Sequence, residues 1–552
     1  MSPENFRAFL SLNFTMANPG FTLPFIVLIF SACSVCAQNL AFETNLPIVY
    51  LNTGGQIISD TPKISSKMEI AWNTNGEPNS TADIHFHFTG DIKIETRGSS
   101  TQNLPKKSYG FELIDSTGAD LDFPLLGMPK ESDWILYAPY NDKTLTRNVF
   151  ALTLASQLSN AYVPRCRYVE LFLNQQYEGI YVLMEKIKRD SSRVDIAKLK
   201  AEDLEGKELT GGYIVKIDKK TGSWGEGWVS DFYNMNNTKT FYQYEYPKFD
   251  EIQDNQKNYI QKYISDFEFA VYNNEDNDGN SYLKYINRQS FFDFIIINEI
   301  SRNVDGYRLS TYLFKEKNGP LHAGPFWDFD RTFGNASYYS GWETNGLALW
   351  ANLKTDNNQV PFWWKFMSRD AAFVNPMQCR WKELRAGCLS NSRIYSVLDS
   401  LIDVIEPALE RNFNRWPILG VKISPNYFVG QTYTDEVMWM KNWIGYRLNY
   451  LDKSFPGICP DEIQAEVDGL VVNVFPNPFK TKINLEIGSD SYQTFEFQLF
   501  SANGSLLENK KITVIKGWLN KEIETRNLNS GMYFYRVVKE NAVISSGKVV
   551  KF

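Results

Sequence analysis

Two aspartates joined by a predicted β-hairpin constrain this chain more than any other feature. Asp305 lies in NVDGYRLSTYLF and Asp328 in GPFWDFDRTF. An apolar run over 290–303 predicts a helix that leads into Asp305, while residues 310–316 and 320–327 flank a Lys-Asn-Gly turn. Asn-Gly between two alternating apolar runs is a strong hairpin signal. The hairpin folds the chain back on itself, so both carboxylates can reach one pocket.

The segment Trp327-Asp328-Phe329-Asp330 alternates aromatic and acidic side chains. In an extended chain residues i and i+2 face the same side, so we expect Asp328 and Asp330 to point together. Two carboxylates on one face suit a hard cation such as Mg²⁺. Solvated acids at a strand end, with Asp330 paired to Arg331, fit the pattern equally. Asp305 would orient and deprotonate a hydroxyl, or simply terminate the preceding helix.

A cationic segment lies nearer the beginning of the chain. Arg97-Gly98-Ser99-Ser100 ends one predicted strand, and Lys106-Lys107 leads into the next. A turn of small residues followed by a lysine is the minimum equipment for holding phosphates. A polar hairpin tip with solvated lysines is the other interpretation.

Composition and net charge indicate a folded protein without a nucleic-acid partner, and the N-terminal segment predicts export. The 552 residues are 43% hydrophobic and 22% charged, which predicts two or more globular domains. A net charge of −7 provides no basic surface for nucleic acid. The apolar run 21–35 and the small residues before Gln38 predict a signal peptide over 1–37. A lipoprotein anchor at Cys33 and an uncleaved membrane helix are the alternatives.

Four cysteines remain after cleavage, and an even number in an exported chain allows one or two disulfides. Cys379 and Cys388 are the closest pair in sequence. A zinc site is not expected, because no CxxC pair survives and only three histidines exist. His85 and His87 alternate on a predicted strand and are interpreted as structural.

The patterns predict an α+β chain. Residues 41–114 are β-rich, a helix is expected over 144–158, a hairpin over 168–173 and 177–185, a strand over 211–218 and a long loop over 223–246. Beyond residue 250 the pattern is helical, including 394–413 and 434–451. We therefore expect a β-rich lobe and a helical lobe around a cleft, with the acidic hairpin on the helical lobe. After a linker at 461–470, short evenly spaced strands predict a β-sandwich over 471–552.

Five ordered motifs resemble the spore-coat CotH kinase family: RGSSTQNLPKKSYGFEL, YNDKTLTRNVFALTLASQL, YVELFLNQQYEGIYVLMEKI, NVDGYRLSTYLFKE and GPFWDFDRTF. Their order and spacing match over roughly 46–455. The resemblance implies a divergent, two-lobed protein-kinase-like domain over 38–460. It also implies transfer of phosphate from ATP, with Mg²⁺ or Mn²⁺, to serine or threonine hydroxyls of an extracellular protein.

The resemblance assigns a role to individual residues. Asp305 matches the catalytic aspartate, and the metal-binding positions are Asp328, Asp330 and Ser310. The nucleotide-binding positions are Arg97, Ser99, Ser100, Lys106 or Lys107, and Glu185. A helix entry with no assigned role is matched by Asp142, Arg147 and Asn148.

Two positions depart from the family pattern. Tyr307 replaces a histidine, and Ser310 replaces an asparagine that would hold a second metal. Serine is shorter than asparagine and offers a hydroxyl instead of an amide oxygen, so the resemblance implies a weakened metal site or a one-metal mechanism.

The C-terminal module resembles the type IX secretion sorting domain through PNPF, LFSANGSLL, LNSGMYFYRVV and GKVVKF. This implies a delivery signal that engages the type IX secretion machinery. The expected location is outside the cell or at the outer cell surface, with attachment to that surface as one alternative.

Two other functions stay open at this stage. A surface protein that keeps the fold without catalysis would act as a structural or adhesive binding module. A glycoside hydrolase would use paired carboxylates with aromatic platforms.

Overall fold

The computed structural model describes the chain between Glu43 and Lys551. The described ranges are 43–83, 85–220, 226–234, 237–273, 281–351, 356–459, 471–489, 493–514, 517–540 and 542–551. The predicted signal peptide over 1–37 and the predicted linker over 461–470 lie outside them. Within these ranges, no helix has both the length and the apolarity needed to cross a bilayer.

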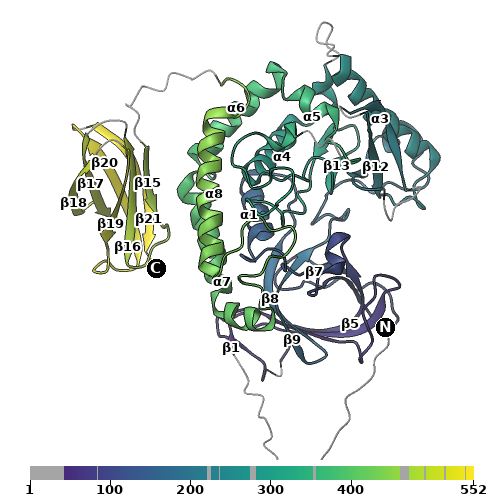
Figure 1. The fold of residues 1–552 in the computed structure, drawn as a ribbon, viewed down its shortest axis with the longest axis horizontal. Coiled ribbons are helices and arrows are strands. Elements are labelled where there is room, and N and C mark those ends of the chain that lie inside the picture. The colour runs from purple at the N-terminus through teal and green to yellow at the C-terminus, as the bar shows by residue number, and fades with distance from the viewer. Residues whose placement is uncertain are drawn as a thin grey trace, which may run out of the picture. The chain divides into compact units, whose positions relative to one another are not determined.

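Seven strands of the first part of the chain close into a barrel, drawn purple to blue in Figure 1. They are β2 (Ile48–Asn52), β3 (Ile64–Ala71), β5 (Phe88–Arg97), β6 (Ser108–Ile114), β7 (Asp133–Tyr137), β8 (Cys166–Leu173) and β9 (Gln176–Glu185). Neighbours pair antiparallel except β2 and β8, whose parallel pairing closes the barrel. Apolar residues from all these strands form one buried core. The β-rich beginning predicted from the sequence is confirmed.

The predicted hairpin of β8 and β9 is also confirmed. Leu173 pairs with Gln176, so the turn consists of Asn174 and Gln175. Both have positive φ, 49° and 67°, as a two-residue turn between right-twisted strands requires.

Helices dominate the later part of the same domain (Figure 1). They are α1 (Arg147–Leu158), α2 (Gly206–Leu209), α3 (Asp254–Asn273), α4 (Arg288–Ser301), α5 (Phe362–Met367), α6 (Ala371–Ala386), α7 (Asn391–Arg415) and α8 (Tyr433–Ser454). Short elements are β1 (Glu43–Thr44), β4 (Asn79–Ser80), η1 (Ser100–Asn103), η2 (Tyr282–Tyr285) and η3 (Ala348–Trp350). Thr432 and Asp435 form a capping box that starts α8.

A buried ion pair joins α4 to α8. Glu299 and Arg447 are both fully buried, and their side chains lie 2.8 Å apart. Glu299 also accepts hydrogen bonds from Ala348 and Leu349 N–H groups, so its charge is well compensated. Removing one partner of such a pair would leave an uncompensated buried charge.

A five-stranded sheet accompanies the helices, in the order β11-β12-β10-β13-β14. Its strands are β10 (Tyr213–Ile217), β11 (Gly227–Tyr233), β12 (Lys239–Tyr246), β13 (Thr311–Lys315) and β14 (Leu321–Ala323). The acidic hairpin is therefore real, with its turn at Asn318 in the left-handed region. The sequence predicted a helical second lobe, and this prediction is incomplete, because the same part of the chain also contains a five-stranded sheet.

The long loop predicted over 223–246 is wrong for its described residues, which form β11 and β12. The apolar alternation is interrupted because several inward side chains are polar. Ser230 donates to Glu268 of α3, and Gln243 donates to the Lys219 carbonyl. Buried polar groups that find partners are compatible with a strand, but they erase its sequence signature.

The C-terminal module is all β, as predicted. A three-stranded sheet contains β15 (Val471–Phe475), β16 (Lys482–Ser489) and β19 (Gly517–Glu524). A four-stranded sheet contains β17 (Gln493–Ser501), β18 (Leu506–Val514), β20 (Gly531–Lys539) and β21 (Ala542–Lys551). Side chains from both sheets share one apolar core, which defines a sandwich.

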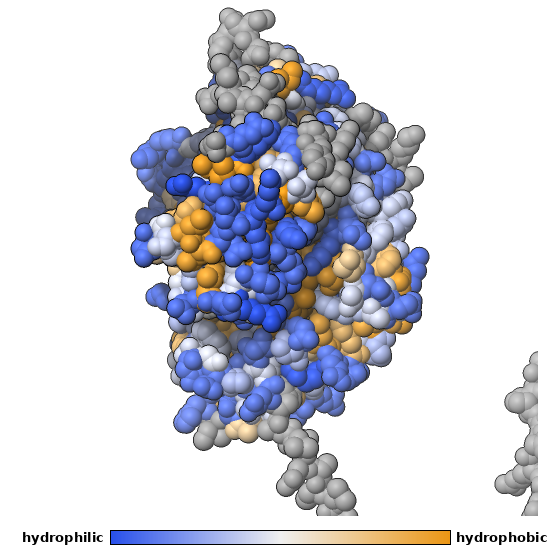
Figure 2. All heavy atoms as spheres, turned by 90° about the vertical axis from the view of Figure 1, so that its left-hand side faces the viewer, coloured by the Kyte–Doolittle hydropathy of each residue, from blue (hydrophilic) through white to orange (hydrophobic). Residues whose placement is uncertain are grey.

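On the face of the molecule shown in Figure 2, hydrophilic side chains predominate and hydrophobic ones are interspersed.

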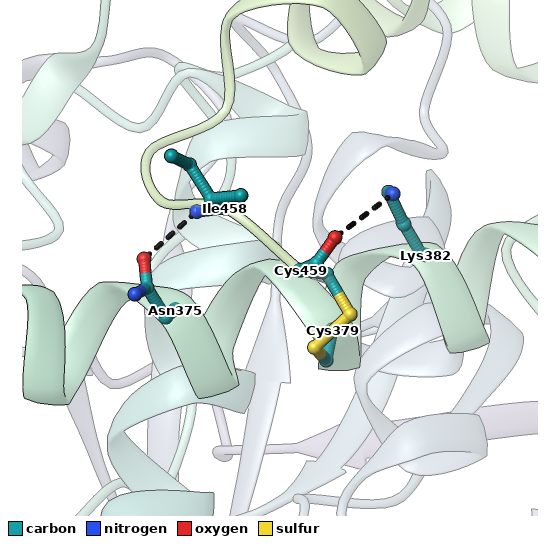
Figure 3. Close-up of a disulfide and its surroundings, with 5 residues drawn as sticks. All are labelled: Asn375, Cys379, Lys382, Ile458 and Cys459. Carbon is teal, nitrogen blue, oxygen red and sulfur yellow. Dashed lines mark hydrogen bonds between the residues drawn. A yellow bond between two sulfur atoms is a disulfide. The ribbon is translucent and has the colours of Figure 1, made fainter. Parts of the chain in front are cut away.

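One disulfide fastens the end of the larger domain. Cys379 of α6 bonds to Cys459, which follows α8, and two hydrogen bonds flank the link (Figure 3). The closest pair in sequence is not joined, because Cys388 has a free thiol, as does Cys166.

The disulfide closes a loop of 80 residues. On the chain-entropy account, replacing both Cys379 and Cys459 by serine should lower the free energy of unfolding by about 4 kcal/mol. Urea unfolding under oxidising conditions measures the effect, with Cys388→Ser as the control that keeps the link. Equal midpoints for the double variant and the control would contradict the prediction.

Candidate active site

A cavity of about 360 Å³ lies where the barrel, the five-stranded sheet and two loops meet. Its volume falls in the range of roughly 300–1,000 Å³ typical of small-molecule sites. The acidic side chains that line it are Asp218, Asp305, Asp328 and Asp330. The basic side chains that line it are Arg97, Lys216, Lys219 and Arg331. Charges of both signs in one cavity suit a ligand that carries phosphates with a divalent cation.

The cavity gathers many of the residues singled out from the sequence. Those that line it are Arg97, Ser99, Asp305, Ser310, Asp328 and Asp330. Ser100 lies in η1, and its side chain is outside the described part of the structure. Lys106, Lys107 and Glu185 do not line the cavity.

The turn after β5 presents Arg97 and Ser99. Gly98 has a φ of 108°, and a Cβ there would collide with the Thr101 hydroxyl, so only glycine fits. The Arg97 guanidinium lies over the Trp327 ring, 5.7 Å from its centroid. Within the described residues it forms no ion pair, so its charge remains available to a ligand.

Asp328 lies in the irregular loop between β14 and a turn that begins at Asp330, so the prediction that Asp328 and Asp330 alternate along a strand is wrong. The hairpin strand β14 ends at Ala323, and Pro325 follows without an N–H for the ladder. Asp328 has a φ of 66°, in the left-handed region. Both carboxylates nevertheless line the cavity, because the loop and the turn deliver them there.

Amide side chains hold this turn in place. Asn148 of α1 accepts from the Phe329 N–H at 3.0 Å, and Asn141 donates to Asp330 Oδ2 at 3.1 Å. Asn335 donates to the carbonyls of Asp330 and Asn141. Asn426 also donates to the Asn141 carbonyl, at 2.6 Å. Four asparagines from distant segments thus fix the two acids.

The helix entry with no role assigned from sequence now has one. Asp142 Oδ2 accepts from the Arg147 N–H at 2.8 Å, and its other oxygen contacts the Arg147 guanidinium at 2.5 Å. This caps the start of α1 and stabilises its partial positive charge. Asn148, the next helical residue, is thereby aimed at the acidic turn.

Asp305 follows α4, whose C-cap residue Arg302 adopts the left-handed conformation. Its two oxygens have separate partners. Arg308 donates to Oδ1 and Tyr338 donates to Oδ2, each at 2.5 Å. Arg331 in turn donates to the Tyr338 hydroxyl at 3.3 Å. The carboxylate is therefore oriented rigidly at the cavity wall.

The two departures from the family pattern have different consequences. Tyr307 is buried and donates to Glu299, so it belongs to the core and leaves the cavity unaffected. Ser310 lines the cavity, and its hydroxyl lies 3.5 Å from Asp218 Oδ2. Sequence reasoning missed Asp218, Lys216 and Lys219. The charged run KIDKK at the end of a predicted strand is the signal that could have found them.

The acidic pair carries an electrostatic cost. Asp328 is exposed to the cavity, yet the surrounding protein removes bulk water and, with Asp330, raises the pKa of Asp328 to about 8. Desolvation likewise raises the pKa of Asp330, against the opposing effect of Arg331. Both raised pKa values mean that the surroundings disfavour the ionised form of these carboxyls unless a positive charge lies nearby.

Lys106 lies outside the cavity, contrary to the expectation that it would reach a phosphate there. Its amine donates to the Ile180 carbonyl at 2.5 Å and to Asn412 of α7 at 3.1 Å, so it joins the barrel to α7. Lys107 donates to the Gln102 carbonyl. Glu185 is fully buried and pairs with Arg165, because successive residues of β9 face opposite sides and Met184 takes the cavity side.

Burial lowers the pKa of Lys106 from 10.5 to about 7. Between pH 7 and pH 10 the unfolded state therefore binds more protons than the folded state, and stability should rise with pH. The rise attributable to this group should approach about 1 kcal/mol per pH unit. Urea unfolding of wild type and Lys106→Met at pH 7.5 and 9.5 isolates it. A pH dependence identical in both proteins would refute the prediction.

Comparison with known families assigns both parts of the chain. The family described as CotH kinase protein matches residues 94–451. The chain belongs to the CotH family. The secretion system C-terminal sorting domain matches residues 473–551, and this domain supports secretion to the cell surface or outside.

Other comparisons add little about this CotH-family chain. No curated protein matches it. It resembles a β-glucosidase from Listeria innocua solved with glucose at 10% identity and a TM-score of 0.12, covering 15% of this chain and 16% of that one. It resembles the alkylpurine DNA glycosylase AlkC of Pseudomonas fluorescens bound to DNA at 12% identity and a TM-score of 0.13, covering 35% and 57%. The chain thus spans under two thirds of either structure, and such low scores carry no argument.

Proposed function

We propose that this protein is a secreted kinase that transfers the γ-phosphate of ATP to serine or threonine hydroxyls of an extracellular protein. One observation carries the proposal: Asp305 and Asp328, from opposite ends of the hairpin, line one cavity with four cations. Membership of the CotH family supports it. The barrel and the helical part would serve as the two lobes of a divergent kinase-like domain.

The donor set fits Mg²⁺ or Mn²⁺ at Asp328 and Asp330. Within the described residues, no three acidic, histidine or cysteine side chains form a complete metal site. Mg²⁺ commonly binds one or two carboxylates and takes its remaining ligands from phosphates and water. The raised pKa of Asp328 supports this proposal, because a nearby positive charge would offset the cost of ionising a desolvated carboxylate. When bound, the ion neutralises charge on the phosphates.

The phosphates would contact Arg97, Ser99, Lys216 and Lys219. Lys219 has its ammonium group without an ion pair among the described residues, and Lys216 lies 3.5 Å from Asp218. These two lysines take the role that the family resemblance gave to Lys106 or Lys107.

In the transfer step Asp305 would hold the acceptor hydroxyl in line with the γ-phosphorus. The hydroxyl oxygen forms the new bond to phosphorus, the bond to the bridging oxygen of ADP breaks, and the hydroxyl proton passes to Asp305. Because such transition states are loose, positioning matters more than base strength. This suits an Asp305 already held by Arg308 and Tyr338.

Asp328→Ala should reduce labelling by radioactive ATP with Mg²⁺ or Mn²⁺ at least about a hundredfold, because charge stabilisation at the phosphates is lost. Lys130→Ala, outside the cavity, is the control and should retain full labelling. Equal labelling of the two variants would end the assignment.

Lys219→Ala should weaken binding of ATP with Mg²⁺ about tenfold, because a charged contact to phosphate is removed. Lys107→Ala is the matched control, since its amine is held by the Gln102 carbonyl. Titration calorimetry measures both. Weaker binding by the Lys107 variant, with Lys219→Ala unaffected, would reverse the lysine assignment.

A non-catalytic surface binder is the second candidate. It is favoured by the state of Asp305, whose oxygens both have protein partners, and by exposed aromatic side chains such as Tyr233 and Tyr272. Nucleotide-dependent thermal shift separates the two functions. No shift with any combination of nucleotide and divalent cation would favour the binder.

A further inference from the structure

Tyr137 has a buried hydroxyl without a hydrogen-bond partner among the described residues. It is the last residue of β7, pairs with Val182 of β9 and lines the cavity. Buried polar groups are nearly always hydrogen-bonded, and an exception calls for a specific explanation. A phenylalanine would supply the same ring to the cavity wall without desolvating a hydroxyl.

The surroundings of this hydroxyl are acidic. The groups with the largest electrostatic effect on it are Asp330, Asp142 and Asp328, and the Tyr168 hydroxyl has a smaller effect. Asp142 already accepts from Thr144 and Arg147, and Tyr168 donates to the Leu145 carbonyl. The remaining neighbours, Asp328 and Asp330, are the acids assigned to the cation.

Toward the neighbouring carboxylates, and toward a phosphoryl oxygen, the phenol acts as the donor. Because the ordinary pKa of a tyrosine hydroxyl is about 10, the proton stays on the oxygen at neutral pH. Its complement is an anionic oxygen, and charge-assisted hydrogen bonds of this kind are among the strongest.

We propose that Tyr137 is a positioning residue that completes its hydrogen bond only when the cavity is loaded, by donating to an anionic oxygen. That oxygen belongs either to a phosphoryl group of the ligand or to Asp330 once it is drawn onto a cation. The proposal rests on the proposed function and extends it. It makes ligand binding, rather than folding, the state in which the Tyr137 hydroxyl is satisfied.

Tyr137→Phe removes one oxygen and tests this directly. Without ligand, the variant should unfold at the same temperature as wild type or higher, because no hydrogen bond is lost. Its affinity for a non-hydrolysable ATP analogue with Mn²⁺ should fall about tenfold. Thermal shift and titration calorimetry supply both readouts without any measurement of activity.

Tyr168→Phe is the matched control. Tyr168 lies on β8 of the same barrel, is buried, and donates to the Leu145 carbonyl at 3.0 Å. Its loss leaves that carbonyl unpaired, so the unliganded unfolding temperature should fall while affinity stays unchanged.

Two ligand conditions, Mn²⁺ alone and the nucleotide analogue with Mn²⁺, distinguish the two sources of the anionic oxygen. A loss of Tyr137→Phe affinity with Mn²⁺ alone identifies Asp330 as acceptor, and a loss only with the nucleotide analogue identifies a phosphoryl oxygen. Unchanged affinity in every condition, or an unliganded destabilisation equal to that of Tyr168→Phe, overturns the inference alone. If wild type binds neither Mn²⁺ nor the analogue, the proposed function fails and the inference fails with it.

Discussion

Asp328 and Asp330 are held near each other against their mutual repulsion, and the architecture of the site follows from that constraint. Desolvation and neighbouring carboxylates, Asp330 for Asp328 and Asp305 for Asp330, raise the pKa of both groups. Asn141, Asn148 and Asn335 hold the acidic turn in place by hydrogen bonding to its backbone and to Asp330. A cation bound between these carboxylates would offset the cost of keeping them ionised in the folded protein.

The scaffold around this demand joins elements far apart in sequence. The barrel supplies Arg97, and the contact of Asp142 with the start of α1 aims that helix at the acidic turn. Strand β10, which pairs with β12 and β13, carries Lys216 and leads into Lys219. Buried polar links hold the scaffold together, among them Lys106 to α7 and Glu299 to Arg447. Each would leave an unpaired polar group in the interior if broken, so the arrangement resists small displacements.

Local patterns predicted the elements that they encode directly. The hairpins at Asn174 and Asn318 follow from turn chemistry, and the long helices follow from apolar spacing. The strand β12 did not, because polar residues such as Gln243 occupy its buried positions. Its interior partners come from elsewhere in the chain, and no local window contains them.

Dependence on distant parts of the chain also separates the site residues that the sequence predicted from those that it did not. Asp305 and Asp328 flank one hairpin, so turn chemistry predicts that they approach each other, while the asparagine contacts that fix Asp328 come from distant segments. Lys219 reaches the cavity only through the pairing of β10 with β13, a register set by distant contacts. Lys106 points at α7 for a similar reason, since Asn412 lies 306 residues away.

The central claim is that the acidic pair binds a divalent ion shared with a nucleotide. Crystals grown with Mn²⁺ and a non-hydrolysable ATP analogue test it through the anomalous signal of manganese. The account predicts a manganese peak coordinated by Asp328 and by a phosphate oxygen, inside the cavity that Asp305 also lines. Nucleotide bound elsewhere, or an anomalous map without a peak at Asp328 under saturating ligand, would contradict it.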